Sequence, residues 1–372
     1  MRQTGLNMEA VKRRNRSSIL RFINSEGPIS KKDIAKRLSL TPAAVTQICG
    51  EFMESGLLVE RGIGDEDVVR AGRKKVLIDI APDYCYIYGI NIDPEHTTVA
   101  LCDLKGIALA EKMIPTEGKL PPEEFLSEIA AICEELRRQT KIPQNRISGA
   151  GVGITGIVDK ERGMSVRAYG IWKEPVELQE ILGKRLKLPV RVENNVNAFA
   201  AAELLFGMGQ RHDNLLLVKW GPGVGSSILV RNHVYDRSHG RAAELGHVIV
   251  EKDGANCSCG RRGCLETRVA GQVLQRRFPG FPERVREEQK LQLQEEIDLF
   301  ARTLVNAATI LLPEKVILYG RLFGHAWLRQ ELTAACGRYD PRFDEDYIRY
   351  SELSAREAYI GPVAFFIKEE IF

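Results

Sequence analysis

The sequence has no hydrophobic run long enough to cross a bilayer and no charged-then-apolar stretch at its start. A membrane-spanning helix needs about 20 predominantly apolar residues, and a secretory leader needs a basic segment followed by an apolar one. We therefore expect a soluble, cytoplasmic protein without a membrane partner. Low-complexity linkers are also lacking, so the 372 residues are expected to form two or three ordinary globular domains.

Cysteine is scarce, with eight residues in the whole chain. Five of them stand singly among apolar neighbours, where buried thiols usually lie, and this distribution argues against a disulfide framework. These five are Cys49, Cys85, Cys102, Cys133 and Cys336.

The other three cysteines, Cys257, Cys259 and Cys264, share a segment of 18 residues with His247. Zinc takes four such ligands in a tetrahedron, and a closed site of this kind is structural. Two glycines between the last two sulfurs allow the backbone to double back, because glycine tolerates positive φ. The pattern predicts a structural Zn²⁺ site within residues 247–264. Three buried cysteines near a histidine are the alternative.

Charge is unevenly distributed, although the formal net charge is only +3. Residues 1–80 contain 15 Lys/Arg and 10 Asp/Glu, a balance of +5, whereas the remainder contains 38 and 40, a balance of −2. A basic N-terminal module on a mildly acidic body suggests a polyanionic partner for the first part only.

Residues 1–80 are predicted to form a winged helix-turn-helix. A helix over 11–24 is stopped by Gly27-Pro28, and Ser30 with Asp33 resembles a capping box at the start of a second helix. Thr41 as N-cap and Pro42 as first helical residue begin a third helix. Its apolar spacing predicts core positions at Val45, Ile48, Cys49, Phe52 and Met53.

The opposite face of the third helix carries small and amide-bearing side chains that can touch base edges in the major groove. Strands over 57–60 and 76–79 would enclose a wing with basic residues for phosphates. The expected DNA contacts are Lys31, Lys32, Ala43, Thr46, Gln47, Arg70, Arg73 and Lys74. The acidic stretch 65–67 counts mildly against contact along the whole wing. A small helical protein-interaction domain is the alternative.

The remaining residues, 81–372, are predicted to form an α/β body. Apolar strands are expected over 86–93, 97–103, 147–154, 190–193 and 215–220, with a long helix over 120–141. Two halves that each begin with a strand, a glycine turn and a strand suggest a duplicated domain around a cleft. We place the boundary between the two domains at Ala81-Pro82, just after the wing.

Residues 81–372 resemble the ROK family of sugar kinases and sugar-responsive repressors, and the N-terminal module is similar to the winged helix-turn-helix of the repressor branch. The segments that carry the resemblance are 193–198, 221–225, 244–247, 257–266 and 312–320. The resemblance implies an α/β fold in which the winged helix-turn-helix precedes a two-lobed, actin-like ATPase (sugar-kinase-like) body. Sugar would bind in the cleft between the two lobes.

The resemblance also implies functions for individual residues. The zinc ligands would be His247, Cys257, Cys259 and Cys264. The effector contacts would be Asn194, Asn195, Glu244, His247 and Glu266. Amides and carboxylates suit this role, because their hydrogen-bonding atoms match vicinal sugar hydroxyls.

One residue and one loop depart from the kinases of the family. Those kinases have a catalytic aspartate where this chain has Asn195, and an amide cannot act as a general base at neutral pH. Their phosphate loop reads Asp-x-Gly-Gly-Thr, whereas the aligned segment here is Asn91-Ile-Asp93-Pro94-Glu95. An acidic pair and a proline without an N–H stand where phosphates would lie. We therefore expect no kinase activity.

The expected function is a DNA-binding transcriptional regulator, a repressor, controlled by a sugar or sugar derivative. It is expected to act as a homodimer or dimer of dimers, because two-fold symmetric proteins read paired half-sites. The alternatives are a sugar kinase with an accessory DNA-binding module and a regulator that has lost its sugar and answers to a protein partner. Effector specificity would lie in cleft residues such as Arg167, Tyr169 and Trp172, although Tyr and Trp more often belong to the core.

Overall fold

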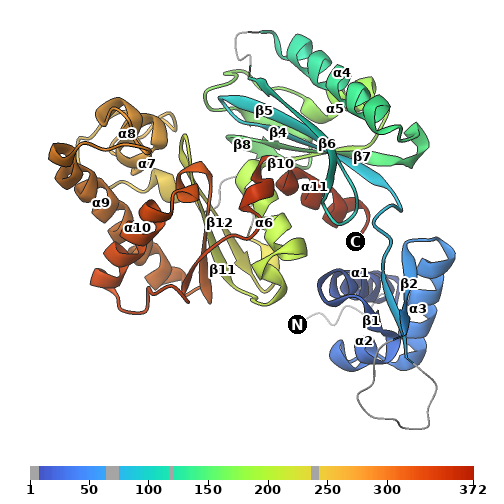
Figure 1. Cartoon of the computed structure of the whole chain (residues 1–372). Coiled ribbons are helices and arrows are strands. Elements are labelled where there is room, and N and C mark those ends of the chain that lie inside the picture. Colours follow the sequence, from blue (N-terminus) through green and yellow to red (C-terminus); the bar gives the residue numbers. More distant parts are fainter. Residues whose placement is uncertain (1–7, 64–74, 117–119, 236–242) are drawn as a thin grey trace, which may run out of the picture.

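The computed structural model describes residues 8–63, 75–116, 120–235 and 243–372 of the chain (Figure 1). Within these ranges, a small N-terminal domain is followed by two larger lobes, each built around a five-stranded sheet. No helix in the described ranges is both long and apolar enough to cross a membrane.

The N-terminal domain consists of three helices and a three-stranded sheet of order β1-β3-β2. Its elements are α1 (Met8–Glu26), β1 (Ile29–Ser30), α2 (Lys31–Arg37), α3 (Pro42–Glu54), β2 (Leu58–Ile63) and β3 (Val76–Ile80). The Ser30 side chain accepts a hydrogen bond from the Asp33 N–H at 3.2 Å, and the Thr41 side chain accepts one from the Ala44 N–H at 3.3 Å. Both predicted helix starts are therefore confirmed.

The apolar face of α3 supplies much of this domain's core. Val45, Ile48, Cys49 and Phe52 are at most 4% exposed, as predicted. Met53 is only half-buried at the edge of the cluster, so its assignment to the core was wrong. Eight residues of helix turn Met53 about 80° away from Val45, which places its side chain beside the apolar stripe rather than within it.

The first lobe contains a mixed sheet of order β10-β7-β4-β5-β6, with helices on both faces (Figure 1). The strands are β4 (Tyr86–Ile92), β5 (His96–Cys102), β6 (Ala108–Pro115), β7 (Ile147–Ile154) and β10 (Val190–Asn194). Two helices, α4 (Pro122–Thr140) and α5 (Leu178–Leu186), bury their apolar residues against one face in a single core cluster. The strands predicted over 86–93, 97–103, 147–154 and 190–193 are thus confirmed.

The second lobe has a sheet of order β13-β12-β11-β14-β15. The strands are β11 (Leu215–Trp220), β12 (Val224–Val230), β13 (His233–Val234), β14 (Lys315–Tyr319) and β15 (Ile348–Tyr350). A second large core packs this sheet against helices of the same lobe, chiefly α9 (Glu287–Leu311) and α10 (Ala326–Tyr339).

Both lobes share one topology. Numbered within its own lobe, each sheet runs in the order 3-2-1-4-5, with the first three strands antiparallel and the last two parallel to the first. This equivalence supports the predicted duplication. One hairpin, β8 (Ile157–Asp159) with β9 (Met164–Arg167), was not predicted, because strands of three and four residues are too short to show a period.

Two helices, α6 (Asn195–Phe206) and α11 (Glu357–Glu370), connect the lobes (Figure 1). They pack closely on one another: a Cβ atom on Gly361 of α11 would lie 2.9 Å from the backbone nitrogen of Phe199 of α6. The Phe199 ring also stacks on Tyr319 of β14, with centroids 3.9 Å apart. Helix α6 therefore contacts both α11 and the sheet of the second lobe.

Apolar residues of the N-terminal domain share a core cluster with α6, and two polar contacts also join the domain to the body. Asn24 of α1 donates a hydrogen bond from Nδ2 to the backbone oxygen of Leu205, near the end of α6, at 2.5 Å. Asp79 of β3 forms an ion pair with Lys105 at the β5–β6 turn, with 2.9 Å between Oδ1 and Nζ. The carboxylate and ammonium are 14% and 25% exposed, so this pair is largely shielded from water.

Candidate functional site

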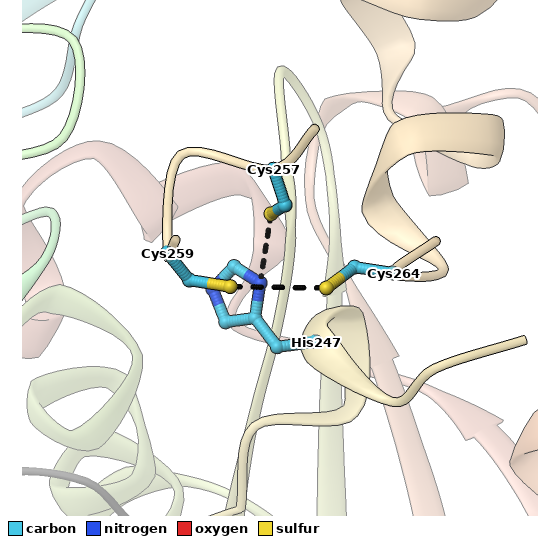
Figure 2. A group of neighbouring side chains, drawn as sticks. All are labelled: His247, Cys257, Cys259 and Cys264. Carbon is cyan, nitrogen blue, oxygen red and sulfur yellow. Dashed lines mark hydrogen bonds between the residues drawn. The ribbon is translucent and has the colours of Figure 1, made fainter. Parts of the chain in front are cut away.

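A compact cluster of possible metal ligands is formed by His247, Cys257, Cys259 and Cys264 (Figure 2). All four candidate ligand atoms lie within 4.8 Å of one another. The Cys257 Sγ is 3.4 Å from His247 Nδ1, and the Cys259 and Cys264 sulfurs are 3.7 Å apart. Tetrahedral zinc with ordinary bond lengths requires S···N separations of about 3.6 Å and S···S separations of about 3.8 Å. The four side chains therefore fit a tetrahedral metal ion.

The backbone of this cluster depends on its glycines. Gly260 and Gly263 have φ values of +91° and +69°, as expected from the sequence. At Gly263 a side chain is also excluded by space, because a Cβ atom would lie 1.8 Å from the backbone oxygen of Glu251. The two glycines allow the chain to return Cys264 toward Cys259 within five residues.

Two of the three thiols are poorly suited to carry charge by themselves. Burial raises the pKa of Cys257 and raises that of Cys264 to about 12. Burial also acts against the charged form of Cys259, but hydrogen bonds from Arg261 outweigh it and lower the pKa of this thiol. Three sulfurs this close would repel one another as thiolates, whereas a divalent cation would deprotonate and hold them. The donor set consequently suits a thiophilic metal better than a metal-free cluster.

The predicted effector residues of the first lobe lie at the start of α6. Asn194 is the N-cap: its Oδ1 accepts hydrogen bonds from the N–H groups of Val196 and Asn197, and its Nδ2 donates to the Gly156 oxygen. These contacts give Asn194 a structural task in addition to its predicted role.

Asn195, the next residue, donates from Nδ2 to Asp93 Oδ1 at 2.6 Å and to Thr155 Oγ1 at 3.1 Å. Both N–H bonds of the amide are directed at groups of the protein. A ligand can therefore meet this amide only through its carbonyl oxygen, which accepts a hydrogen bond and cannot remove a proton.

Two predicted effector residues of the second lobe, Glu244 and Glu266, lie close in sequence to the His247 and cysteine cluster but contact different groups. Glu266 accepts a hydrogen bond at Oε2 from the Val224 N–H, at the end of the glycine turn 221–225, at 3.2 Å. Glu244 pairs with Arg261, with 2.6 Å between Oε2 and Nη2. Glu244 also lines a cavity of about 470 Å³ between the η3 turn (Leu245–His247) and α9.

The two aromatic residues considered for specificity have different environments. The Tyr169 ring of the first lobe meets the His247 ring edge-on at 6.1 Å, and the Arg167 guanidinium lies 5.4 Å from the Tyr169 centroid. Trp172 is 6% exposed and packs on Phe125 in the core. Tyr169 thus remains a candidate for the cleft, whereas Trp172 is a core residue.

Sequence reasoning missed a group of charges between the lobes. Lys219 of β11 places its Nζ 3.5 Å from Asp93 Oδ2 and 3.3 Å from Glu357 Oε1. The signal available in the sequence was the lysine itself, because a charged residue within an apolar strand needs a partner when buried.

The predicted DNA face is formed by α3. Ala43, Thr46 and Gln47 are exposed on it, and Lys32 is exposed at the start of α2, whereas Lys31 is half-buried. Arg70, Arg73, Lys74 and the acidic stretch 65–67 lie outside the described residues.

Gln47 also has a neighbour that was not predicted. Its Nε2 donates to Glu51 Oε1 at 3.2 Å, and Glu51 in turn forms ion pairs with Lys12 and Arg16 of α1. These cations offset the only carboxylate that contacts the predicted base-reading side chains in the described part of the chain.

Comparison with known proteins agrees with this architecture. Residues 87–368 match the profile of the ROK family, and residues 12–59 match a winged helix-turn-helix DNA-binding profile. The chain belongs to the ROK family. The resemblance inferred from its motifs is thereby confirmed, as is the fold of a winged helix-turn-helix followed by an actin-like, sugar-kinase-like body.

Similar proteins include a putative xylose repressor of Caldicellulosiruptor sp. (strain Rt8B.4), 30% identical over 268 residues that cover 72% of this chain and 66% of that protein. The DNA-binding transcriptional dual regulator NagC of Escherichia coli K12 is 29% identical over 274 residues, 73% of this chain and 66% of NagC. This ROK protein thus spans about two thirds of the length of these curated relatives.

Two solved structures share the fold. A ROK family transcriptional regulator, a homolog of the E. coli MLC protein, has a TM-score of 0.75 at 23% identity and covers 96% of this chain and 97% of its own. A ROK family glucokinase from Streptomyces griseus, solved with glucose and AMPPNP, has a TM-score of 0.60 at 22% identity and covers 75% of this chain and 98% of its own. The regulator therefore covers more of this chain than the glucokinase does.

Proposed function

We propose that this ROK protein is a transcriptional repressor whose affinity for operator DNA is controlled by a sugar or sugar derivative bound between its two lobes. The observation that carries the proposal is the path of α6. This helix begins at Asn195, a predicted effector contact, and near its end Leu205 accepts the hydrogen bond from Asn24 of the DNA-binding module. The relatives named as a putative xylose repressor and as the DNA-binding transcriptional dual regulator NagC support the same function.

The alternative, a sugar kinase with an accessory DNA-binding module, is disfavoured by the environment of Asn195. A kinase needs a general base beside the attacking hydroxyl, and the Asn195 amide is instead held by Asp93 and Thr155. Losing such a base typically costs about 10²–10⁴-fold in rate. We therefore propose a regulator without enzymatic activity.

We assign residues 1–80 to DNA binding and 81–372 to effector binding. The base-reading residues would be Ala43, Thr46 and Gln47, and the lysines at positions 31 and 32 would contact phosphates, together with the basic residues of the wing. The functional unit would be a homodimer or dimer of dimers, because one recognition helix covers only a few base pairs and a two-fold protein reads paired half-sites.

We assign the metal centre to structural zinc. His247 and the three cysteines would hold the ion, which would supply a rigid attachment for the segment 247–264 on the second lobe. Through His247, whose ring meets Tyr169 of the first lobe, this attachment would also order the cleft.

Two measurements test the function. A thermal-shift screen would use monosaccharides and their phosphates, including xylose and N-acetylglucosamine, because a ligand that binds only the folded protein raises Tm. Operator sequences would be selected from random DNA, and binding would be measured with and without each stabilising sugar. The expected result is sequence-selective DNA binding that one sugar changes at least several-fold. No DNA affinity at low salt, or sugar-dependent ATP hydrolysis, would contradict the proposal.

A further inference from the structure

The turn between β4 and β5 carries two carboxylates, and both reach the second lobe. Asp93 Oδ2 lies 3.5 Å from Lys219 Nζ of β11. Glu95 Oε2 lies 3.4 Å from Arg321 Nη1, and Glu95 Oε1 accepts a hydrogen bond from Gln272 Nε2 at 3.3 Å. The turn therefore joins the lobes at two adjacent points.

Asp93 is held in place by its own lobe. It accepts hydrogen bonds from Asn91 Nδ2 at 2.9 Å, from Thr155 Oγ1 at 2.8 Å and from Asn195 Nδ2 at 2.6 Å. Four donors, counting Lys219, surround one carboxylate. If the Asp93 carboxylate moved away from Lys219, its hydrogen bond with Asn195 would also be disturbed, because both interactions belong to one network.

Lys219 is the corresponding fixed point of the second lobe. Its side chain is 15% exposed, and its ammonium also lies 3.3 Å from Glu357 Oε1, at the first residue of α11. Burial alone would lower the pKa of Lys219, but the Asp93 and Glu357 carboxylates raise it above its usual value, so the side chain remains a cation. A shielded ion pair of this kind is screened by salt much less than an exposed one.

We propose that Asp93, Glu95, Lys219, Arg321 and Glu357 form an interlobe clasp that holds the lobes together without a nucleotide, with Asp93 as the positioning residue for Asn195. Side-chain cations of the second lobe meet an acidic turn of the first, in the segment aligned with the phosphate loop of the kinases. The charges that phosphates and a metal ion would contribute are thus replaced by groups of the protein.

The interlobe clasp has a direct consequence for the effector. Because Asp93 takes the Nδ2 of Asn195, the carbonyl oxygen of this amide is the atom left to accept a hydroxyl from a ligand. Binding at Asn195 and contact between the lobes therefore share one carboxylate. The role of Asp93 in effector binding rests on the proposed function, whereas its role in holding the two lobes together does not.

The closure is tested on the full chain without any sugar. Small-angle scattering gives the radius of gyration, and hydrogen exchange reports opening at residues 93–95 and at the start of α11. Lys219→Met and Asp93→Asn are each expected to increase the radius of gyration and the rate of hydrogen exchange in these segments. Lys112→Met is the matched control, because Lys112 pairs with Glu135 at 2.7 Å within the first lobe. Magnesium with AMP-PNP is expected to leave the wild-type radius of gyration unchanged.

Wild-type values in both Lys219→Met and Asp93→Asn would overturn the interlobe clasp, and so would compaction of the wild type by AMP-PNP. If Lys219→Met does not fold, Arg321→Ala on the exposed rim and Asp93→Asn decide the question. A purely structural role would lower Tm without changing the radius of gyration of the folded protein.

A separate experiment measures the affinity for a sugar that stabilises the wild type in the thermal-shift screen. Asp93→Asn should weaken its affinity by about 5- to 150-fold, the usual range for coupled sites. An unchanged affinity would refute the positioning role of Asp93. If no sugar in the panel binds the wild type, the proposed function fails, while the scattering result still decides the interlobe clasp.

Discussion

The contact between α1 and α6 provides the most direct test of communication between the two domains. Asn24→Ala removes the Nδ2 donor to the Leu205 oxygen. That oxygen also accepts a hydrogen bond from Gln210 Nε2, so the variant leaves no buried carbonyl without a partner. The loss is therefore that of one ordinary hydrogen bond, about 0.5–1.5 kcal/mol, which corresponds to about two- to thirteen-fold in an equilibrium constant.

The assay is operator binding by the full chain, with and without a sugar that stabilises it. The ratio of the two Kd values measures the coupling between the sites. Asn24→Ala should reduce this ratio about two- to thirteen-fold while sugar affinity in the absence of DNA changes little. Ser25→Ala is the matched control, because the Ser25 hydroxyl bonds only to Phe22 of the same helix among the contacts described. A ratio equal to that of the wild type would refute transmission through this contact.

Three further predictions concern other parts of the molecule. Cys259→Ser should lower both Tm and the zinc content found by elemental analysis, because a zinc ligand is lost; wild-type protein free of zinc after purification without chelators would refute the assignment. Burial raises the pKa of Glu203, so its contribution to stability is full below its unfolded pKa and declines as pH rises toward its folded pKa. Glu203→Gln should therefore gain Tm relative to the wild type as pH rises above 4.5, the ordinary pKa of glutamate, and parallel Tm curves would contradict this. Gln47→Ala should weaken operator binding by about 1–3 kcal/mol and random DNA much less, whereas Lys32→Ala should weaken both alike and flatten the salt dependence; equal losses on both DNAs for Gln47→Ala would exclude base reading.

The sequence predicted best what is encoded locally. The strands β7 and β11 have the predicted bounds, because each is a continuous buried run that ends at a turn. The grouping of the four candidate metal ligands could be predicted for the same reason, since three of the four lie within eight residues and glycines set the turn between them. Helix caps at Ser30 and Thr41 depend on neighbours only three residues away.

The interlobe contacts could not be predicted in this way. Lys219 and Asp93 are 126 residues apart, and their proximity depends on how two complete sheets are placed. The same limitation applies to Tyr169 and Trp172, which lie three residues apart in the sequence. Tyr169 contacts His247, whereas Trp172 packs in the core, and only the three-dimensional structure distinguishes these two environments.

The close approach of α6 and α11 has a consequence for how regulation could be lost. Gly361 leaves no room for a methyl group, because its nearest neighbours are backbone atoms of Ala198 and Phe199, which cannot rotate aside. A single added carbon there would push α6 away from α11 and alter the position of both of its ends together. Mutants that ignore the effector are therefore expected at this contact between α6 and α11, although every residue proposed to touch DNA or the sugar keeps its identity. A genetic screen for mutants that no longer respond to the effector would then recover substitutions far from both the DNA and the sugar.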